Sequence, residues 1–353
     1  MRQVVITEQG VHVHAESESL LLARGGIEIQ RIRLGEIEQL LLCGRIELSS
    51  GAIIALTRRN IEVVFLTEHG RFRARLWTRH GPDVALRIKQ LNLVNNPDFA
   101  ISLARRMIAA KMEHQRRILL RAQRNWKDPD VGNSLSRLRH LVNLALSAAT
   151  PPALLGMEGE AAALYFRHFN KLIKFPDMAF NGRSRRPPKD PPNACLSFGY
   201  TLLGTIIESD VLRRGLDPFP GVFHEPRYNR ASLALDILEE FRPLVDSLTL
   251  RLINCRQIGP ADFENPAQLT AEEALEESEP VQDESGSAGL AVYLNATGRK
   301  VFLAEFYSKL RDKIYYPPRD ASMTLREIIT EQVELAARCF RDNSSDYTGF
   351  IPG

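Results

Sequence analysis

The chain has 353 residues, of which 44% are hydrophobic and 25% are charged. This composition excludes a mostly disordered chain, a collagen-like repeat and a small disulfide-stapled fold, and the length predicts two domains or one large one. The 46 Lys and Arg against 43 Asp and Glu leave a net charge of +3. The total charge therefore does not identify a nucleic-acid partner. Whether the chain binds nucleic acid has to be judged from the distribution of charge along the sequence.

The four cysteines lie far apart, and none forms a CxxC pair. This spacing argues against a zinc ribbon or an iron–sulfur cluster and is typical of a reducing compartment. The N-terminus lacks the apolar core of a signal peptide, and no apolar run approaches the ~20 residues of a membrane span. We therefore predict a cytoplasmic protein with no membrane partner.

Residues 3–77 have the pattern of β-strands. Apolar and polar residues alternate at 11–14, 27–30 and 46–48, and 61–66 is a compact apolar run rich in β-branched residues. One short helix is expected near 51–59. Residues 71–77 alternate again with arginines on one face, which we interpret as a solvated outer face rather than a phosphate contact.

The hydrophobic period becomes helical after His80, Gly81 and Pro82 and stays so almost to the end. The predicted fold class is α+β: an N-terminal β-rich domain at 1–80, a linker at 81–90, and a larger all-α-helical domain at 91–353. The acidic stretch 272–284 is expected to be a solvated surface insertion.

Positive charge is concentrated in two places. Residues 99–127 hold eight Lys or Arg against one acid, Glu113. Such a helix could neutralise DNA phosphates or simply be exposed on several sides, and this segment alone does not separate the two. The second cluster is a proline-rich loop with Arg183, Arg185, Arg186 and Lys189.

Glu158 stands on an apolar helix face. Thr150 and Pro151 suit the N-cap and first positions of a helix, in which Glu158 shares its face with Ala161, Ala162, Tyr165 and Phe169. A carboxylate there needs a hydrogen-bonding partner, an arginine or a metal ion. On this segment alone, a rim glutamate paired with a local arginine is the simpler interpretation. Gly156 and Gly159 on the opposite face predict close approach of another backbone.

A second polar set follows at 215–243. His224 lies in a turn-rich stretch, which makes a core-packed histidine less expected. In the next helix, Asp236, Glu239 and Glu240 project beside an apolar stripe at spacings of three and four. Taken alone, such acids indicate a solvated face. Together with Glu158, however, one histidine and several carboxylates are a suitable set for Mg²⁺ or Mn²⁺. Beside basic clusters, such an ion points to phosphodiester chemistry.

The order and spacing of these motifs resemble the CRISPR-associated integrase/endonuclease of the spacer-acquisition module. Each motif is weak, but their ordered combination over nearly the whole helical part is specific. The motifs lie at 156–159, 186–188, 190–194, 197–200, 215–218, 224, 232–236 and 239–243, and stretches 44–49 and 61–65 match the family's β-domain.

The resemblance implies that Glu158, His224 and Glu239 bind the divalent metal and that Asp236 is an auxiliary catalytic acid. Arg183, Arg186 and Tyr200 are implied contacts near the scissile DNA strand. The implied reaction is attack by the 3′-hydroxyl of a short foreign DNA fragment on a phosphodiester at the repeat boundary of a CRISPR array. No covalent enzyme intermediate is needed.

The implied partners are the protospacer DNA, the CRISPR repeat, a second copy of the chain joined through the β-domain, and a small companion protein bridging two homodimers. Two alternatives stay open. A mobile-element integrase or branched-DNA repair nuclease of the same fold would share the site. A non-catalytic DNA-binding scaffold would use the basic helix and show no metal dependence.

Overall fold

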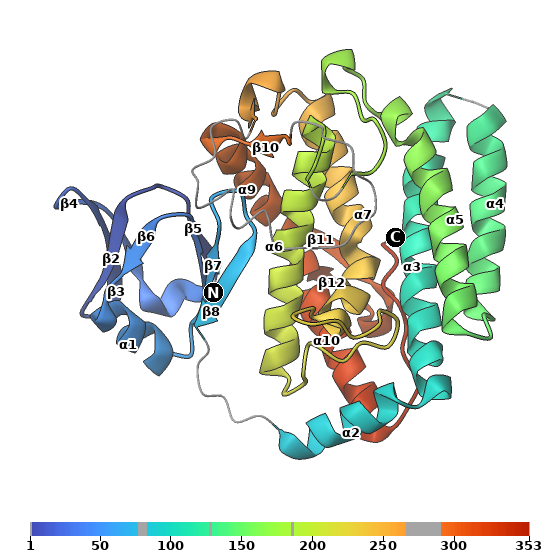
Figure 1. Cartoon of the computed structure of the whole chain (residues 1–353), viewed down its shortest axis with the longest axis horizontal. Coiled ribbons are helices and arrows are strands. Elements are labelled where there is room, and N and C mark those ends of the chain that lie inside the picture. Colours follow the sequence, from blue (N-terminus) through green and yellow to red (C-terminus); the bar gives the residue numbers. More distant parts are fainter. Residues whose placement is uncertain (1, 77–82, 127–128, 185–186, 266–290, 353) are drawn as a thin grey trace. The chain divides into compact units, whose positions relative to one another are not determined.

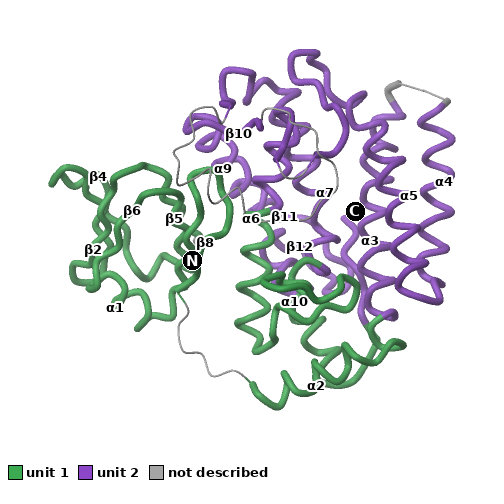
Figure 2. The backbone as a smooth tube through the Cα atoms, viewed as in Figure 1, with its two compact units in different colours: residues 1–100, 201–235, 333–346 green, residues 101–200, 236–332, 347–353 purple. Residues whose placement is uncertain are grey.

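The computed structural model describes residues 2–76, 83–126, 129–184, 187–265 and 291–352 (Figure 1). The predicted joint at 80–82, Arg186 and the acidic stretch 272–284 lie outside these residues. The described chain forms two compact units, each assembled from separate stretches (Figure 2). Unit 1 comprises residues 1–100, 201–235 and 333–346; unit 2 comprises 101–200, 236–332 and 347–353.

The N-terminal part of unit 1 holds two four-stranded sheets, with strand orders β1-β5-β7-β8 and β4-β3-β2-β6. Within the first, β1, β5 and β7 are parallel and β8 is antiparallel to β7. The strands are β1 (Arg2–Ile6), β2 (Val11–Glu16), β3 (Ser19–Arg24), β4 (Ile27–Arg33), β5 (Ile37–Cys43), β6 (Ile46–Leu48), β7 (Glu62–Leu66) and β8 (Phe72–Leu76).

The β-rich part is held by one hydrophobic cluster. Alternate residues of the strands, such as Val11 and Val13 of β2, point into it and are 1% exposed. The helix expected at 51–59 is α1 (Ser50–Arg58), whose N-cap Ser49 accepts from the Ala52 N–H. Ala52 and Leu56 of α1 complete the cluster. The predicted α+β class is confirmed in this order, strands first and helices after.

The rest of the chain is mostly helical. The long helices are α2 (Val84–Val94), α3 (Pro97–Trp126), α4 (Pro129–Leu146), α5 (Pro151–Phe169), α6 (Pro191–Arg213), α7 (Ser232–Asn254), α9 (Ala296–Leu310) and α10 (Leu325–Asp342). Because α2 begins at Val84, it takes up part of the predicted linker. By length and composition α6 could cross a membrane, but 72% of its most apolar stretch is buried inside the protein, as in a core helix.

Two short antiparallel pairs interrupt the helical part. They are β9 (Phe263–Glu264) with β10 (Tyr293–Leu294), and β11 (Lys313–Tyr316) with β12 (Ala321–Thr324). Strands of two to four residues show too little alternation to stand out in a sequence. The helical domain is therefore not purely helical.

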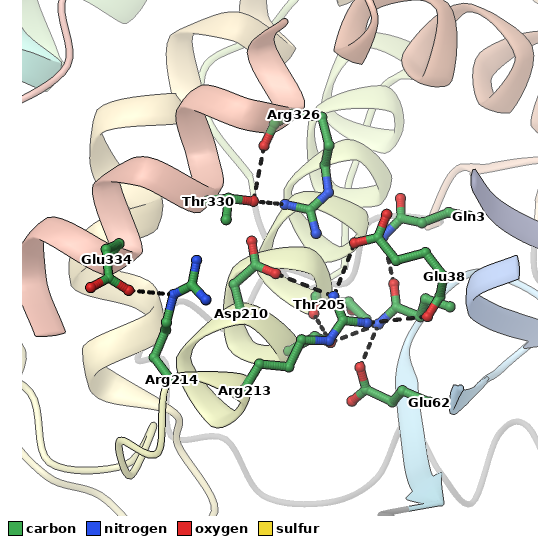
Figure 3. A network of polar contacts seen from close by, with 12 residues as sticks. Gln3, Glu38, Glu62, Thr205, Asp210, Arg213, Arg214, Arg326, Thr330 and Glu334 are labelled. Atoms are coloured by element: carbon green, nitrogen blue, oxygen red, sulfur yellow. Dashed lines mark hydrogen bonds and ion pairs between the residues drawn. The ribbon is translucent and has the colours of Figure 1, made fainter. Parts of the chain in front are cut away.

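Polar contacts join α6 to the first sheet within unit 1 (Figure 3). Arg213 of α6 donates to Glu38 of β5 at 2.9 Å. The Arg75 guanidinium of β8 lies 2.7 Å from Glu62 and 3.1 Å from Glu208, and only 8% of its side chain is exposed. The predicted solvated outer face is therefore wrong for Arg75, because α6 supplies a carboxylate that the local strand pattern cannot reveal.

Candidate functional site

Glu158 emerges from helix α5 of unit 2 among apolar neighbours, as its spacing predicted. Thr150 caps α5 by accepting from the Ala153 N–H, and Ala161, Tyr165 and Phe169 on the Glu158 face are fully buried. The Glu158 side chain is 16% exposed. The predicted close approach at Gly156 and Gly159 is wrong, because both are exposed and no described atom outside their own helix backbone lies within 4 Å of an added Cβ.

The compensating charge for Glu158 is Lys111 of helix α3. Its ammonium donates to Glu158 Oε1 and also lies 2.6 Å from Oε2 of Glu239, on helix α7. The Lys111 side chain is 7% exposed and that of Glu239 is 5% exposed. The expected local arginine is thus wrong for Glu158. An arginine pairs instead with Glu160, whose carboxylate binds Arg137 on the protein surface.

The three acids of α7 are all buried, so their interpretation as a solvated face is wrong. Asp236 is 0% exposed, Glu239 4% and Glu240 0%. The helix carries them inside unit 2, where Glu239 and Glu240 contact different partners. Glu239 joins Lys111, whereas Glu240 binds the C-terminal segment. Two adjacent carboxylates therefore serve separate networks.

Arg242 extends the cluster from Glu239 towards a buried tyrosine. Its Nε lies 3.0 Å from Glu239 Oε1, and its guanidinium stacks 4.9 Å from the centroid of the Tyr200 ring. Burial alone lowers the pKa of Arg242, but Glu239, Tyr200 and Glu158 raise it above the usual value of a guanidinium. The cation thus stays charged and holds Glu239 in one orientation.

Tyr200 is held in place by Asp246. It is 8% exposed, and its hydroxyl donates to the carboxylate of Asp246. Burial raises the pKa of Asp246 to about 6, although the hydroxyls of Tyr200 and Tyr165 lower it. Arg183 stacks on the same Tyr200 ring at 5.4 Å. The DNA-contact roles of Arg183 and Tyr200 stay predictions, and Arg186 lies outside the described residues.

Glu240 forms the second network of α7. Its Oε2 accepts from the Phe350 N–H at 2.6 Å and from the Gln332 amide at 2.9 Å, while the Tyr347 hydroxyl donates to Oε1. Burial raises the pKa of Glu240 to about 8, against the lowering effect of these three donors. Nearby on α3, burial lowers the pKa of His114 to about 3. These contacts fix the C-terminal segment against the helix that carries Glu239.

His224 belongs to unit 1, in the turn-rich segment between α6 and α7. Its ring is half-buried and lies 5.1 Å from the Phe223 ring in an edge-on arrangement. The segment enters α7 through Leu233, whose N–H donates to the Pro218 carbonyl at 2.9 Å. Thus Glu158, Glu239 and Asp236 share unit 2, and His224 does not.

The basic helix of the sequence is α3, and it is largely internal. Arg116 and Arg117 both pair with Glu113, and Lys111 faces the acids. Of its basic residues with described side chains, Arg106, Arg121 and Arg124 are exposed. Some of the basic side chains of α3 are therefore paired with acids of the protein, and others are exposed to solvent.

Within the described ranges, no group of three or more His, Cys, Asp or Glu side chains is arranged as metal ligands. Glu158 and Glu239 nevertheless converge on one cation from two helices, and carboxylate oxygens are the donors that Mg²⁺ and Mn²⁺ prefer. The donor chemistry therefore fits a hard divalent ion, and Lys111 occupies the position between the two carboxylates.

Lys111 lies outside the sequence motifs, and Arg242 lies within the 239–243 motif but had no predicted role. Lys111 is one of eight basic residues in its helix, yet it shares a face with Met107 and Ile108, which are fully buried. A single lysine on an apolar stripe is the same signal that singled out Glu158. Applied to lysines as well as acids, that test would have found it.

Comparison with solved structures identifies the architecture. A CAS1 protein from Thermotoga maritima is 23% identical, with 97% of each chain covered and a TM-score of 0.77. The Cas1-containing chain of a Cas6-RT-Cas1–Cas2 complex is 23% identical with a TM-score of 0.80, covering 99% of this chain and 36% of that one. A casposase bound to its integration product is 20% identical, covers 99% and 93%, and has a TM-score of 0.79. These likenesses establish the Cas1 fold.

Sequence comparison identifies the family. The family model described as CRISPR associated protein Cas1 matches residues 4–308. A CRISPR-associated endonuclease Cas1 of Rhodospirillum rubrum is 36% identical over 84% of this chain and 93% of its own length. Another from Chlorobaculum tepidum is 32% identical over 99% of this chain and 98% of its own. The chain belongs to the Cas1 family of CRISPR-associated endonucleases.

Proposed function

We propose that this chain inserts short foreign DNA fragments into a CRISPR array with the help of a divalent metal ion. The observation that carries the proposal is the convergence of Glu158 and Glu239 on a single cation inside unit 2. Membership of the Cas1 family supports it, because the curated relatives are named endonucleases.

Glu158, Glu239 and His224 would hold one Mg²⁺ or Mn²⁺, with Asp236 as a buried auxiliary acid. When bound, such an ion activates an attacking oxygen and neutralises charge on the transferring phosphate. Arg242 fixes the Glu239 carboxylate through its contact at 3.0 Å, and Tyr200 and Asp246 support that guanidinium. These residues pre-set the carboxylate geometry before DNA arrives.

The proposed reaction is a transesterification. The 3′-hydroxyl of the fragment forms a new bond to phosphorus at the repeat boundary, and the target strand leaves with a free 3′-hydroxyl. The number of phosphodiester bonds is unchanged, so no external energy source is required. Water in place of the 3′-hydroxyl would give metal-dependent nicking of branched or single-stranded DNA.

The proposed partners are DNA, a second copy of the chain and a small companion protein. One structural neighbour belongs to a complex with Cas2, and another is bound to an integration product. On this chain, the edge strand β4 exposes Ile27 by 74% and Ile29 by 47%. An exposed apolar edge strand favours pairing with another chain. We therefore assign the homodimer contact to the β-rich part.

An integration assay tests the function. A supercoiled plasmid carrying a CRISPR array is incubated with a fragment bearing free 3′ ends, Mg²⁺ or Mn²⁺, and a chelator control. Glu158→Ala and His224→Ala are expected to lower joined product at least about 100-fold, with DNA affinity nearly unchanged. The matched control is Glu160→Ala, which removes only a surface ion pair on the same helix and keeps parental activity.

The same assay separates the alternatives. A non-catalytic scaffold gives salt-sensitive DNA binding and no product that depends on metal. A mobile-element integrase joins fragments equally well to a plasmid without the repeat. Parental joining by Glu158→Ala or His224→Ala would show that the assigned residues do not form the site.

A further inference from the structure

Lys111 stands where the proposed metal site needs a cation. Helix α3 brings its ammonium between Glu158 of α5 and Glu239 of α7, all within unit 2. No other lysine among the described residues is buried. A lysine seldom gives up hydration unless carboxylates compensate it, and here two carboxylates share one ammonium.

The charges around Lys111 balance without any added ion. Glu158 and Glu239 carry two negative charges, and Lys111 and Arg242 carry two positive charges. A divalent ion on the same oxygens would stand a few ångströms from the ammonium and leave the four-residue group with an excess of two positive charges. Two cations at that separation repel strongly in a poorly solvated site. This repulsion disfavours a state in which the ion and the ammonium both hold these oxygens.

We propose that Lys111 is an internal counter-cation that competes with the divalent metal for Glu158 and Glu239. In the metal-free chain it holds the two carboxylates together. Because the metal ion has to displace this ammonium, Lys111 lowers the affinity of the site for the metal. The proposal rests on the metal dependence proposed above. Arg242 does not share this role, because it contacts Glu239 from the side opposite to Lys111: Oε1 faces Arg242 and Oε2 faces Lys111.

Mn²⁺ titration of the purified full chain by calorimetry, without DNA, tests the competition. Lys111→Met keeps an unbranched side chain and removes the charge, and it is expected to tighten Mn²⁺ binding about tenfold or more. The matched control is Arg116→Met, which removes a cation of the same helix that pairs with Glu113 and leaves Mn²⁺ affinity unchanged. Lys111→Gln is the second variant, for use if Lys111→Met does not fold. Its amide removes the charge but still donates a hydrogen bond to a carboxylate.

The outcomes separate this proposal from the proposed function. Unchanged or weaker Mn²⁺ binding by the Lys111 variants, with normal binding by the parent, overturns the competition and leaves the metal site standing. Absence of binding in the parent and all variants overturns the metal site and the competition with it.

A metal-free measurement tests the other half of the proposal. In chelator, Lys111→Met is expected to lower the urea midpoint of unfolding, because two buried carboxylates lose their shared cation. Adding Glu158→Gln to Lys111→Met is expected to raise the midpoint again by removing one of them. If the second substitution lowers the midpoint further, Lys111 does not hold the carboxylates together.

Discussion

The buried carboxyl of Glu240 predicts a distinct dependence of stability on pH. Burial raises its folded-state pKa to about 8, whereas an unfolded glutamate has a pKa of about 4.3. Between these values the folded chain keeps a proton that the unfolded chain has released. The stabilising contribution is therefore complete below the unfolded pKa and is lost as pH rises through the folded pKa.

The best window is pH 6.5 to 8. Burial lowers the pKa of His114 to about 3, so that ring changes stability mostly below the unfolded histidine value of about 6.5, and it does so equally in the parent and in a Glu240 variant. Asp246, with its pKa raised to about 6, acts below this window as well. Over 1.5 pH units, Glu240 alone is expected to remove about 2 kcal/mol of unfolding free energy, at about 1.4 kcal/mol per unit.

Urea unfolding in chelator at pH 6.5, 7.0, 7.5 and 8.0 measures this slope. Glu240→Gln has no proton to release. Its unfolding free energy is therefore expected to fall about 2 kcal/mol less between pH 6.5 and 8 than that of the parent. Glu160→Gln, a surface acid of the same unit, should keep the parental slope. Parallel curves for the parent and Glu240→Gln would refute the reasoning, because Glu240 would then be ionised in the folded chain.

Two further predictions concern unit 1. Arg75→Met leaves Glu62 and Glu208 without their shared guanidinium, so urea unfolding is expected to show a loss of about 3 kcal/mol; a loss under 1 kcal/mol contradicts the buried pairing. Burial already raises the pKa of Glu208 against the lowering effect of Arg75. At acidic pH Glu208 is protonated and needs no counter-charge, so Arg75→Met should be less destabilised relative to the parent there than at neutral pH. Ile29→Lys tests the proposed homodimer. It places a charge beside Ile27 on the β4 edge, so a dimer formed through this edge should dissociate to monomer in sedimentation velocity, with unfolding free energy unchanged within about 0.5 kcal/mol; a dimer that persists in the variant places the contact elsewhere.

Local sequence patterns determined the division of the chain into strands and helices. The alternation at 11–14 and 27–30 lies in β2 and β4, and Thr150 caps α5 as its residue type predicted. These features depend on neighbours within a few residues, which a sequence displays directly. The pairs β9–β10 and β11–β12 were missed because their strands are too short for a period to appear.

The candidate site was predictable only in part. A carboxylate on the apolar face of α5 marked Glu158 as needing compensation, but the nature of that compensation depends on which helix packs against α5. The partner is Lys111, 47 residues earlier in the chain, and not a local arginine. The same holds for the acids of α7. The spacing of Asp236, Glu239 and Glu240 is typical of a solvated face, yet all three are buried, because other elements pack against that face.

For Glu158 the sequence by itself determined that a charge would be costly, because hydrophobic periodicity indicates which face of a helix is buried. For the acids of α7 it did not, since all three are buried. It also determined the family, through motifs whose order along the chain is specific. Only the tertiary structure decided how most of these charges are compensated. Lys111 and the C-terminal segment reach the acids from elements distant in sequence, whereas Arg242 pairs with Glu239 three residues away in the same helix. Coulomb energies depend on separation in space, which no local pattern records.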